Sequence, residues 1–302
     1  MIRKNADKPA TLLCIINPAA GRRRWLTLTM HRLTAYAEQH NITLQIEYTR
    51  HRGDGGRIIQ SYREGKDAVV VLGGDGTVRE VVEGMIDNPL PILIIPHGTA
   101  NVLSKELFIP QDPVKALSLW RTGRIKHIDL GMINEHPFVL MVSSGIDALT
   151  VHSVYKAEKK FFGKFAYVLA VLRTLTRRKP PLTTLEIYDD DLQKVVVSGY
   201  QVIISNGKYY AGRIVINPTA SLNSGYLHVM VYKQPGIGAL ITMMFNVLSG
   251  QSQHLKDLHQ YKAKQVVIKT RRRRFLQFDG DRLDEKGGTV QVLASRLPVV
   301  VQ

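Results

Sequence analysis

The sequence predicts an α/β domain followed by a mainly antiparallel β domain. The chain has 302 residues, which is enough to build two cores of ordinary size. Apolar strand-like runs alternate with helical patterns in the first part, whereas strand-like runs follow one another from about Arg124. We therefore expect a three-layer α/β domain with a mainly parallel sheet, then an antiparallel β-sandwich, with a barrel as the alternative. A cleft between the two domains is the expected place for the active site.

The first domain is predicted from four apolar runs that alternate with helical patterns. Continuous Val and Ile runs are typical of parallel strands that are covered on both faces. Helical spacing follows the first run, where apolar residues recur at Leu26, Met30, Leu33 and Ala37. Further helices are expected near 54–65, after Asp75 and at 102–107, and the strands are expected at 11–18, 42–48, 68–72 and 91–96.

The second domain is predicted from a series of strands with little helix between them. Helical patterns interrupt this series only near 154–176 and 237–248. We place the domains at 1–130 and 131–289, and the last strand, in 290–302, is a candidate to return to the first domain. The expected strands are 125–133, 138–145, 183–189, 194–205, 213–218, 226–232 and 264–270.

The composition indicates a cytoplasmic protein with anionic partners. Forty-one Lys and Arg against 25 Asp and Glu leave a net charge of +16, which favours nucleic acid, anionic lipid headgroups or phosphorylated small molecules. The single cysteine, Cys14, excludes an intrachain disulfide and fits a reducing compartment. The two most apolar stretches, 161–175 and 237–248, are shorter than the roughly 20 residues that span a bilayer.

Three loops follow predicted parallel strands, so they should gather along one edge of the sheet. They are NPAAG at 17–21, GGDGT at 73–77 and PHGTAN at 96–101. Glycines in the second loop let the backbone approach a ligand closely, and the helix that follows directs its positive dipole end into the turn. We expect Thr77 and Glu80 to form the capping box that starts this helix.

The GGDGT turn suits a phosphate, although it matches neither of the two commonest phosphate loops. No Lys-Ser/Thr pair follows it, and Arg79 stands where a dinucleotide fingerprint has its third glycine. Asp75 would repel phosphates unless it holds Mg²⁺ or takes up a proton, so its presence favours phosphoryl transfer over passive binding. The alternative is a tight strand-to-helix turn without a ligand.

Several segments in the same order resemble the diacylglycerol kinase and sphingosine kinase superfamily, in its bacterial lipid kinase branch. GGDGT with Glu80 and Gly84 resembles the catalytic motif of that superfamily, and "IINPAAG" and "PHGTANVLSKEL" resemble its first and third nucleotide loops. "SSGIDA" at 143–148, "ISNGKYYAGRIVINPTA" at 204–220 and "FDGD" at 278–281 resemble its later segments. The resemblance runs almost from end to end.

The resemblance implies an ATP-dependent kinase that phosphorylates a hydroxyl of diacylglycerol or a related lipid and uses Mg²⁺. Asp75 would approach the ATP-bound Mg²⁺, and Asn101 would support the third loop. Asp279 and Asp281 stand where the family has DGE, the pair near the transferred phosphate that includes the general base, and Asp147 matches a supporting acid. The ATP site would be lined by Asn17, Thr49, Gly73, Gly74, Asp75, Gly76, Thr77, Val78, Arg79 and Thr99.

The sequence departs from the family pattern in three places. The last acid of "DGD" is Asp rather than Glu, and the alternative is that "DGD" is only a turn. "NSGYLHV" has Ser224 and His228 where many bacterial members have acids that bind a structural Mg²⁺, so that metal site is expected to be altered or lost. "YYAGR" carries Ala211 and Arg213 in place of a more glycine-rich loop.

The expected partners are a lipid substrate and an anionic membrane surface, to which the protein binds peripherally. The basic, apolar segment 159–179 and the segment 237–248 are the candidates for that contact, with packing in the core as the alternative for each. A homodimer is a candidate state, and no specific nucleic acid is expected. The rival functions are an NAD kinase-like enzyme and a non-catalytic basic module that binds lipid or nucleic acid.

Overall fold

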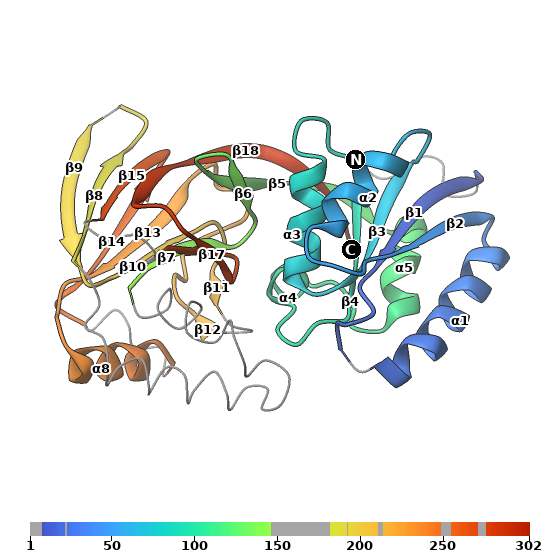
Figure 1. Cartoon of the computed structure of the whole chain (residues 1–302), viewed down its shortest axis with the longest axis horizontal. Helices are drawn as coiled ribbons and strands as arrows, with labels where there is room; N and C mark the ends of the chain where they lie inside the picture. The colour runs from blue at the N-terminus through green and yellow to red at the C-terminus, as the bar shows by residue number, and fades with distance from the viewer. Residues whose placement is uncertain are drawn as a thin grey trace. The chain divides into compact units, whose positions relative to one another are not determined.

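A computed structural model describes residues 8–21, 23–145, 182–191, 193–210, 214–248, 255–270 and 276–302. The chain divides into two compact units, which are treated separately below (Figure 1). Unit 1 contains the residues up to Asp129 and Ser295–Gln302, and unit 2 contains Leu130–Tyr210 and Ile214–Ala294. The predicted helix at 154–176, the basic residues of 271–274, and Asp147, Ala211 and Arg213 lie outside the described residues.

Unit 1 contains the predicted parallel sheet. Its strands β1 (Ala10–Ile16), β2 (Ile42–Tyr48), β3 (Ala68–Gly73) and β4 (Ile92–Pro96) run parallel in the order β2-β1-β3-β4. Val299, near the end of β18 (Gly287–Val301), pairs parallel with β4. Every residue of β3 and of β4 is buried, which is why both read as unbroken apolar runs.

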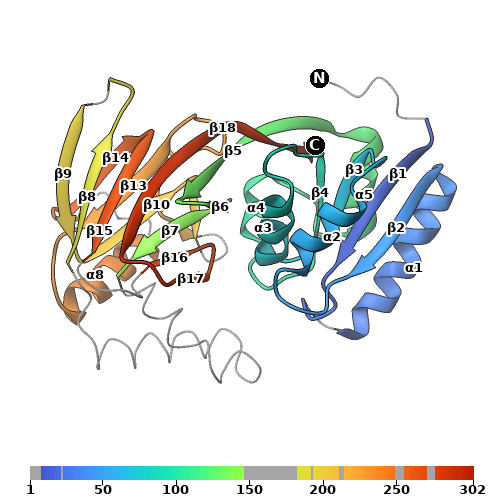
Figure 2. The ribbon, with the colours of Figure 1, turned by 45° about the horizontal axis from the view of Figure 1, so that its top comes forward.

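Helices cover both faces of the parallel sheet, as Figure 2 shows. α1 (Arg23–Gln39) packs with α5 (Pro113–Thr122) on one face, and α2 (Asp54–Tyr62) packs with α3 (Asp75–Gly84) on the other. A further short helix, α4, spans Val102–Glu106. The sequence interpretation missed α5, although Asp112 caps it through two backbone N–H groups and Pro113 is its first residue, both of which are helix-start signals.

Glycines bring α2 and α3 unusually close together. A Cβ atom on Gly84 of α3 would lie 2.5 Å from the carbonyl oxygen of Gly56 in α2. Glu80 of α3 also accepts a hydrogen bond of 3.2 Å from the backbone N–H of Gly55. This contact fixes the axis of α3, and so fixes the turn from which α3 starts.

Unit 2 is built from antiparallel strands in two sheets. The six-stranded sheet has the order β14 (Leu258–Ala263), β13 (Leu227–Tyr232), β10 (Gln201–Ser205), β7 (Met141–Ser144), β16 (Leu276–Phe278), β17 (Asp281–Leu283). The other sheet has the order β9 (Lys194–Gly199), β8 (Thr183–Tyr188), β15 (Gln265–Thr270) and the first part of β18. β5 (Arg124–Ile133) pairs with β18 and with β6 (His136–Phe138).

The two sheets of unit 2 enclose one apolar core, so the sandwich prediction is confirmed. Leu185 of β8 and Val266 of β15 belong to the same buried cluster as Val202 of β10 and Val229 of β13. A short hairpin, β11 (Tyr209–Tyr210) with β12 (Ile214–Val215), and the helix α8 (Ile237–Leu248) complete the described part of this unit. Among the described residues, no helix is long and apolar enough to cross a membrane.

Candidate active site

The three predicted loops of unit 1 meet at the carboxyl ends of β1, β3 and β4. The backbone N–H of Asn17 donates to the carbonyl of Leu72 at 3.0 Å, and the N–H of His97 donates to the carbonyl of Gly73 at 2.9 Å. The strand order β2-β1-β3-β4 makes the junction of β1 with β3 the topological switch point of the sheet. Ligands of open α/β sheets bind at such a point, so the expected gathering of loops falls at the favoured position.

Two glycines allow the second and third loops to touch through their backbones. A Cβ atom on Gly98 would lie 2.5 Å from the Cα of Gly74, which is closer than real Cβ contacts come. Asn101 closes the third loop, since its Oδ1 accepts the N–H of Gly98 at 2.8 Å and its Nδ2 donates to the carbonyl of Gly98 at 3.0 Å. Asn101 therefore supports the third loop, as the resemblance implied.

The capping box expected at the start of α3 is wrong. The helix begins three residues earlier than expected, with Gly74 instead of Thr77 as its N-cap and without a side-chain cap. Thr77 is buried within the first turn, where its Oγ1 accepts a hydrogen bond of 3.0 Å from Nδ2 of Asn17. The Glu80 carboxylate accepts its hydrogen bond from the N–H of Gly55 in α2 and does not reach back to the start of α3. Both side chains thus join α3 to its neighbours instead of capping it.

Asp75 fastens the second loop to the third. Its carboxylate oxygens accept hydrogen bonds from the backbone N–H groups of Val102 at 3.0 Å and Leu103 at 3.1 Å. These are the first residues of α4, so Asp75 satisfies the start of that helix from a distant point in the sequence. Burial raises the pKa of Asp75, and the two backbone hydrogen bonds partly oppose this rise.

The remaining predicted ATP-site residues differ in exposure. The N–H of Thr49, at the end of β2, donates to the carbonyl of Ile16 at 2.9 Å, and its side chain is buried. Val78 and Arg79 are buried as well, and Arg79 forms an ion pair of 2.7 Å with Glu83. Thr99 is exposed. A Cβ atom on Gly76 would meet nothing within 4 Å, so open space adjoins the first turn of α3.

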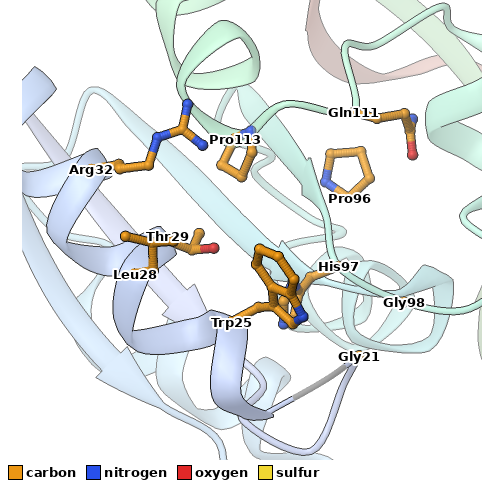
Figure 3. Close-up of a pocket in the computed structure, with 10 residues that line it drawn as sticks. All are labelled: Gly21, Trp25, Leu28, Thr29, Arg32, Pro96, His97, Gly98, Gln111 and Pro113. Carbon is orange, nitrogen blue, oxygen red and sulfur yellow. The ribbon is translucent and has the colours of Figure 1, made fainter.

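A cavity of about 330 Å³ adjoins the third loop on the α1 and α5 side (Figure 3). His97 lines it, and its Nε2 is buried without a hydrogen-bond partner among the described residues. Burial lowers the pKa of His97 below its usual 6.5, which favours the neutral imidazole. Gly21 and Gly98, from the first and third loops, also line this cavity, together with Trp25, Leu28, Thr29, Arg32, Pro96, Gln111 and Pro113.

In unit 2, the "DGD" segment forms a tight hairpin turn between β16 and β17. Phe278 pairs with Asp281, and the two residues between them, Asp279 and Gly280, have φ angles of 46° and 84°. Positive φ at both positions is the geometry for which Asp-Gly is favoured in two-residue hairpins. The turn interpretation of "DGD" is therefore correct for the backbone, and it leaves open what the two carboxylates do.

The two carboxylates of this turn have different surroundings. Asp279 accepts three backbone N–H groups, from Val139 at 2.6 Å and from Leu140 and Met141 at 2.9 Å each. Asp279 therefore anchors the turn to the segment that leads into β7. Asp281 is the first residue of β17 and is partly exposed.

Sequence reasoning missed a buried glutamine that holds the same turn from inside. Gln277 is 2% exposed; its Oε1 accepts the N–H of Gly280 at 2.8 Å, and its Nε2 donates to Oγ of Ser143 at 2.7 Å. Glutamine is a polar residue that is seldom buried, so its place inside an apolar strand run was the available signal.

The segment with Ser224 and His228 is organised around a lysine. Nζ of Lys264 donates to the carbonyl of Gly225 at 2.8 Å, lies 4.0 Å from the ring centroid of Tyr226 and 3.4 Å from a carboxylate oxygen of Asp190. The Tyr226 hydroxyl also donates to Asp190, which raises the pKa of Tyr226.

The residues present at this segment do not fit a structural Mg²⁺. Oγ of Ser224 lies 3.4 Å from Nε2 of His228. Neither side chain supplies the carboxylate oxygens that Mg²⁺ prefers. A cationic ammonium group already lies against the loop carbonyl. Among the described residues, no group of three or more His, Cys, Asp or Glu could hold a metal ion.

Two protein-family profiles match the chain in the order of its two units. The diacylglycerol kinase catalytic domain matches residues 11–133, and the YegS C-terminal NAD kinase beta sandwich-like domain matches residues 140–301. The match of the first unit to a diacylglycerol kinase catalytic domain identifies the class of protein as a lipid kinase.

Individual relatives agree with these matches. A diacylglycerol kinase of Bacillus subtilis (strain 168) is 29% identical over 220 residues, which are 71% of each chain. A diacylglycerol kinase of Staphylococcus carnosus (strain TM300) is 26% identical over 277 residues, covering 88% of this chain and 87% of the relative. The crystal structure of a diacylglycerol kinase from Bacillus anthracis str. Sterne is 25% identical, with a TM-score of 0.76 over 98% of both chains.

The chain belongs to the diacylglycerol kinase family of lipid kinases, in the branch with a YegS-type C-terminal domain. It is an ATP-dependent lipid kinase, so the family resemblance drawn from the sequence is confirmed.

Proposed function

We propose that this lipid kinase transfers the γ-phosphoryl group of ATP to the free hydroxyl of diacylglycerol or a closely related lipid. Support for the acceptor comes from the family domain and from relatives named as diacylglycerol kinases. The observation that carries the proposal is the junction of the three loops in unit 1, where Gly74 and Gly98 touch and open space adjoins Gly76.

The loop junction suits the phosphates of ATP for physical reasons. Phosphates bind at helix N-termini, where backbone N–H groups point outward and the helix dipole is positive. The first turn of α3 provides such a terminus, and Asn17, Thr77 and Gly76 form its surroundings. We propose that the ten residues predicted to line the ATP site hold ATP here. The exposed Thr99 and the backbone of 73–77 lie nearest to the nucleotide, and the buried Val78 and Arg79 support α3.

We propose different roles for the three predicted catalytic aspartates. Asp281 accepts the proton of the lipid hydroxyl. At the same time the hydroxyl oxygen of the lipid forms a bond to the γ-phosphorus, and the bond from that phosphorus to the bridging oxygen of ADP breaks. Asp279 acts as a positioning residue that fixes the turn carrying Asp281. Asp75 holds the second and third loops together, and it is the acidic residue of these loops that could approach Mg²⁺.

We propose that Mg²⁺ arrives with ATP. Bound Mg²⁺ would neutralise charge on the phosphates, which is its usual contribution to phosphoryl transfer. We also propose that the protein works at an anionic membrane surface from the cytoplasmic side, in phospholipid metabolism. Its net charge of +16 supports this, because each suitably placed Lys or Arg contributes about 1 kcal/mol of attraction to an anionic leaflet. A homodimer is compatible with these proposals, and none of them depends on it.

Label transfer from γ-labelled ATP tests the proposed acceptor. The purified protein is incubated with Mg²⁺ and mixed micelles that contain diacylglycerol, sphingosine or phosphatidylglycerol, with Asp75→Ala beside it. Label should enter diacylglycerol, and the variant should lose that transfer. Label that enters only sphingosine or phosphatidylglycerol would contradict the proposed acceptor while leaving a lipid kinase.

NAD belongs in the same panel because the C-terminal domain is of an NAD kinase-like sandwich type. Phosphorylation of NAD in place of lipid would favour the NAD kinase alternative. Salt-sensitive binding to lipid or nucleic acid without any ATP turnover would instead indicate a binding module.

A further inference from the structure

Helix α8 combines an apolar composition with an exposed phenylalanine, Phe245, among its described side chains. None of its twelve residues, Ile237–Leu248, is charged. Ala239 and Met243, one helical turn apart, pack on a cluster that contains Met141, Ile203 and Met230 of the six-stranded sheet. One side of the helix is therefore anchored in the core, as the core-packing alternative for this segment predicts.

Phe245 of the same helix lies at the surface, because its side chain is 68% exposed. This value is the highest among the large apolar side chains of unit 2 in the described part of the chain. Gly238 and Thr242, which precede Phe245 by seven and three residues on the helix, are exposed as well. An uncharged helix that presents Phe to the outside suits a membrane interface better than water.

The described segments before and after α8 in the chain each carry an exposed lysine. Lys233 lies four residues before the helix, Lys256 lies in the described segment that follows it, and both are exposed. The two segments are joined, because the N–H of Lys233 donates to the carbonyl of Asp257 at 3.1 Å. The Asp257 carboxylate accepts a hydrogen bond of 2.8 Å from Gln234. Exposed lysines next to an apolar helix are complementary to anionic headgroups above an acyl layer.

We propose that α8 is a membrane-docking element, which inserts Phe245 at the boundary between headgroups and acyl chains of an anionic bilayer while Lys233 and Lys256 contact the headgroups. This inference rests on the proposed function at a membrane surface and assigns the contact to one helix. It predicts that binding depends on Phe245 and on anionic lipid together.

A fluorescent label on residue 245 tests the contact directly. The single native cysteine, Cys14, is fully buried, and burial raises its pKa to about 12, so a thiol reagent will label an introduced cysteine selectively. Phe245→Cys is labelled with an environment-sensitive dye and mixed with vesicles of equal parts phosphatidylcholine and phosphatidylglycerol. The matched control is Val196→Cys, because Val196 is 59% exposed on β9.

The dye at residue 245 should shift to the blue with the anionic vesicles and change little with phosphatidylcholine alone, whereas the dye at residue 196 should not shift. Phe245→Glu should weaken vesicle binding by about tenfold or more, because the charged side chain cannot replace the burial of the apolar ring in the bilayer. Val196→Glu should bind like wild type. An unshifted dye at residue 245 on vesicles that bind the protein, or equal binding by the two Glu variants, would overturn the proposal.

Kinase assays separate this proposal from the proposed function. Phe245→Glu should phosphorylate diacylglycerol in vesicles more slowly than wild type, and should match wild type on a water-soluble short-chain diacylglycerol. Equal losses on both substrates would contradict a docking role for α8. A wild-type protein that phosphorylates neither substrate but still inserts residue 245 would contradict the proposed acceptor and support the docking element.

Discussion

The GGDGT loop of unit 1 and the "DGD" turn of unit 2 both use an aspartate to accept backbone N–H groups from another segment of the chain. In unit 1, Asp75 accepts two backbone N–H groups from α4, and in unit 2, Asp279 accepts three from the segment before β7. The two differ in what else shapes the loop. Contact between Gly74 and Gly98 shapes the first, whereas the buried side chain of Gln277 supports the second. A motif aspartate can therefore be an anchor even where its family pattern indicates catalysis.

The largest loss of stability is expected where a carboxylate anchor is removed from unit 1. Asp75→Ala leaves the N–H groups of Val102 and Leu103 without their acceptor in a largely buried place, which should cost roughly 2 to 4 kcal/mol. Chemical unfolding measures this loss, and ATP affinity should fall with it because α4 and the third loop are released.

Asp112→Ala is the matched control for that variant. Asp112 also accepts two helix-start N–H groups, but locally and near the surface, so its loss should cost about 1 kcal/mol and leave ATP affinity unchanged. Equal stability losses for the two variants would show that Asp75 does no more than an ordinary N-cap.

Glycine substitutions test the part of the loop that depends on backbone contact. Gly98→Ala places a methyl group against the Cα of Gly74, which should cost about 1 to 3 kcal/mol of stability. Gly76→Ala meets open space and should keep the stability of wild type, but its methyl group should weaken ATP binding. Calorimetric titration with ATP and thermal unfolding measure both quantities. An unchanged ATP affinity in Gly76→Ala would remove that space from the proposed nucleotide site.

Lys264→Met tests the ammonium group that contacts Gly225 and Tyr226 in the segment with Ser224 and His228. The free energy of unfolding of this variant should fall by about 1 kcal/mol. The hydrogen bond to Gly225 is charge-assisted, but its contribution is limited because the ammonium group is partly exposed. Lys262→Met, in an exposed neighbour on β14, should change stability little. A chelator should not alter the unfolding midpoint of the wild-type protein. A midpoint that falls with chelator and recovers with Mg²⁺ would contradict the lysine-based interpretation.

The smallest effect concerns the pH dependence of unit 2. Burial, assisted by Lys262, lowers the pKa of His228 below its usual 6.5. In the unfolded chain His228 therefore binds a proton near pH 6.5, whereas in the folded chain it binds one only at lower pH. His228 thus reduces the free energy of unfolding as the pH falls through 6.5. His228→Gln should show a smaller loss between pH 7.5 and 5.5 than wild type in thermal unfolding. Parallel curves for the two proteins would exclude this contribution.

The sequence was most informative where a local pattern determines the structure. Unbroken Val and Ile runs predicted the parallel sheet, and three loops placed after strands predicted their meeting at one edge. The capping box failed because Thr77 and Glu80 have tertiary partners, Asn17 and Gly55, that no local pattern shows. Asp75 and Asp279 were chosen as catalytic from their motifs, whereas their contacts with distant backbone N–H groups depend on the folded chain.

The division of roles in the "DGD" turn is the central claim, and one paired measurement tests it. The unfolding midpoint and kcat with diacylglycerol are measured for Asp281→Asn and Asp279→Asn in the same preparation. Asp281→Asn should lower kcat by about 10² to 10⁴-fold, as the loss of a general base does, with a smaller change in midpoint than Asp279→Asn. Asp281→Asn with wild-type kcat, or Asp279→Asn with a wild-type midpoint, would contradict the account.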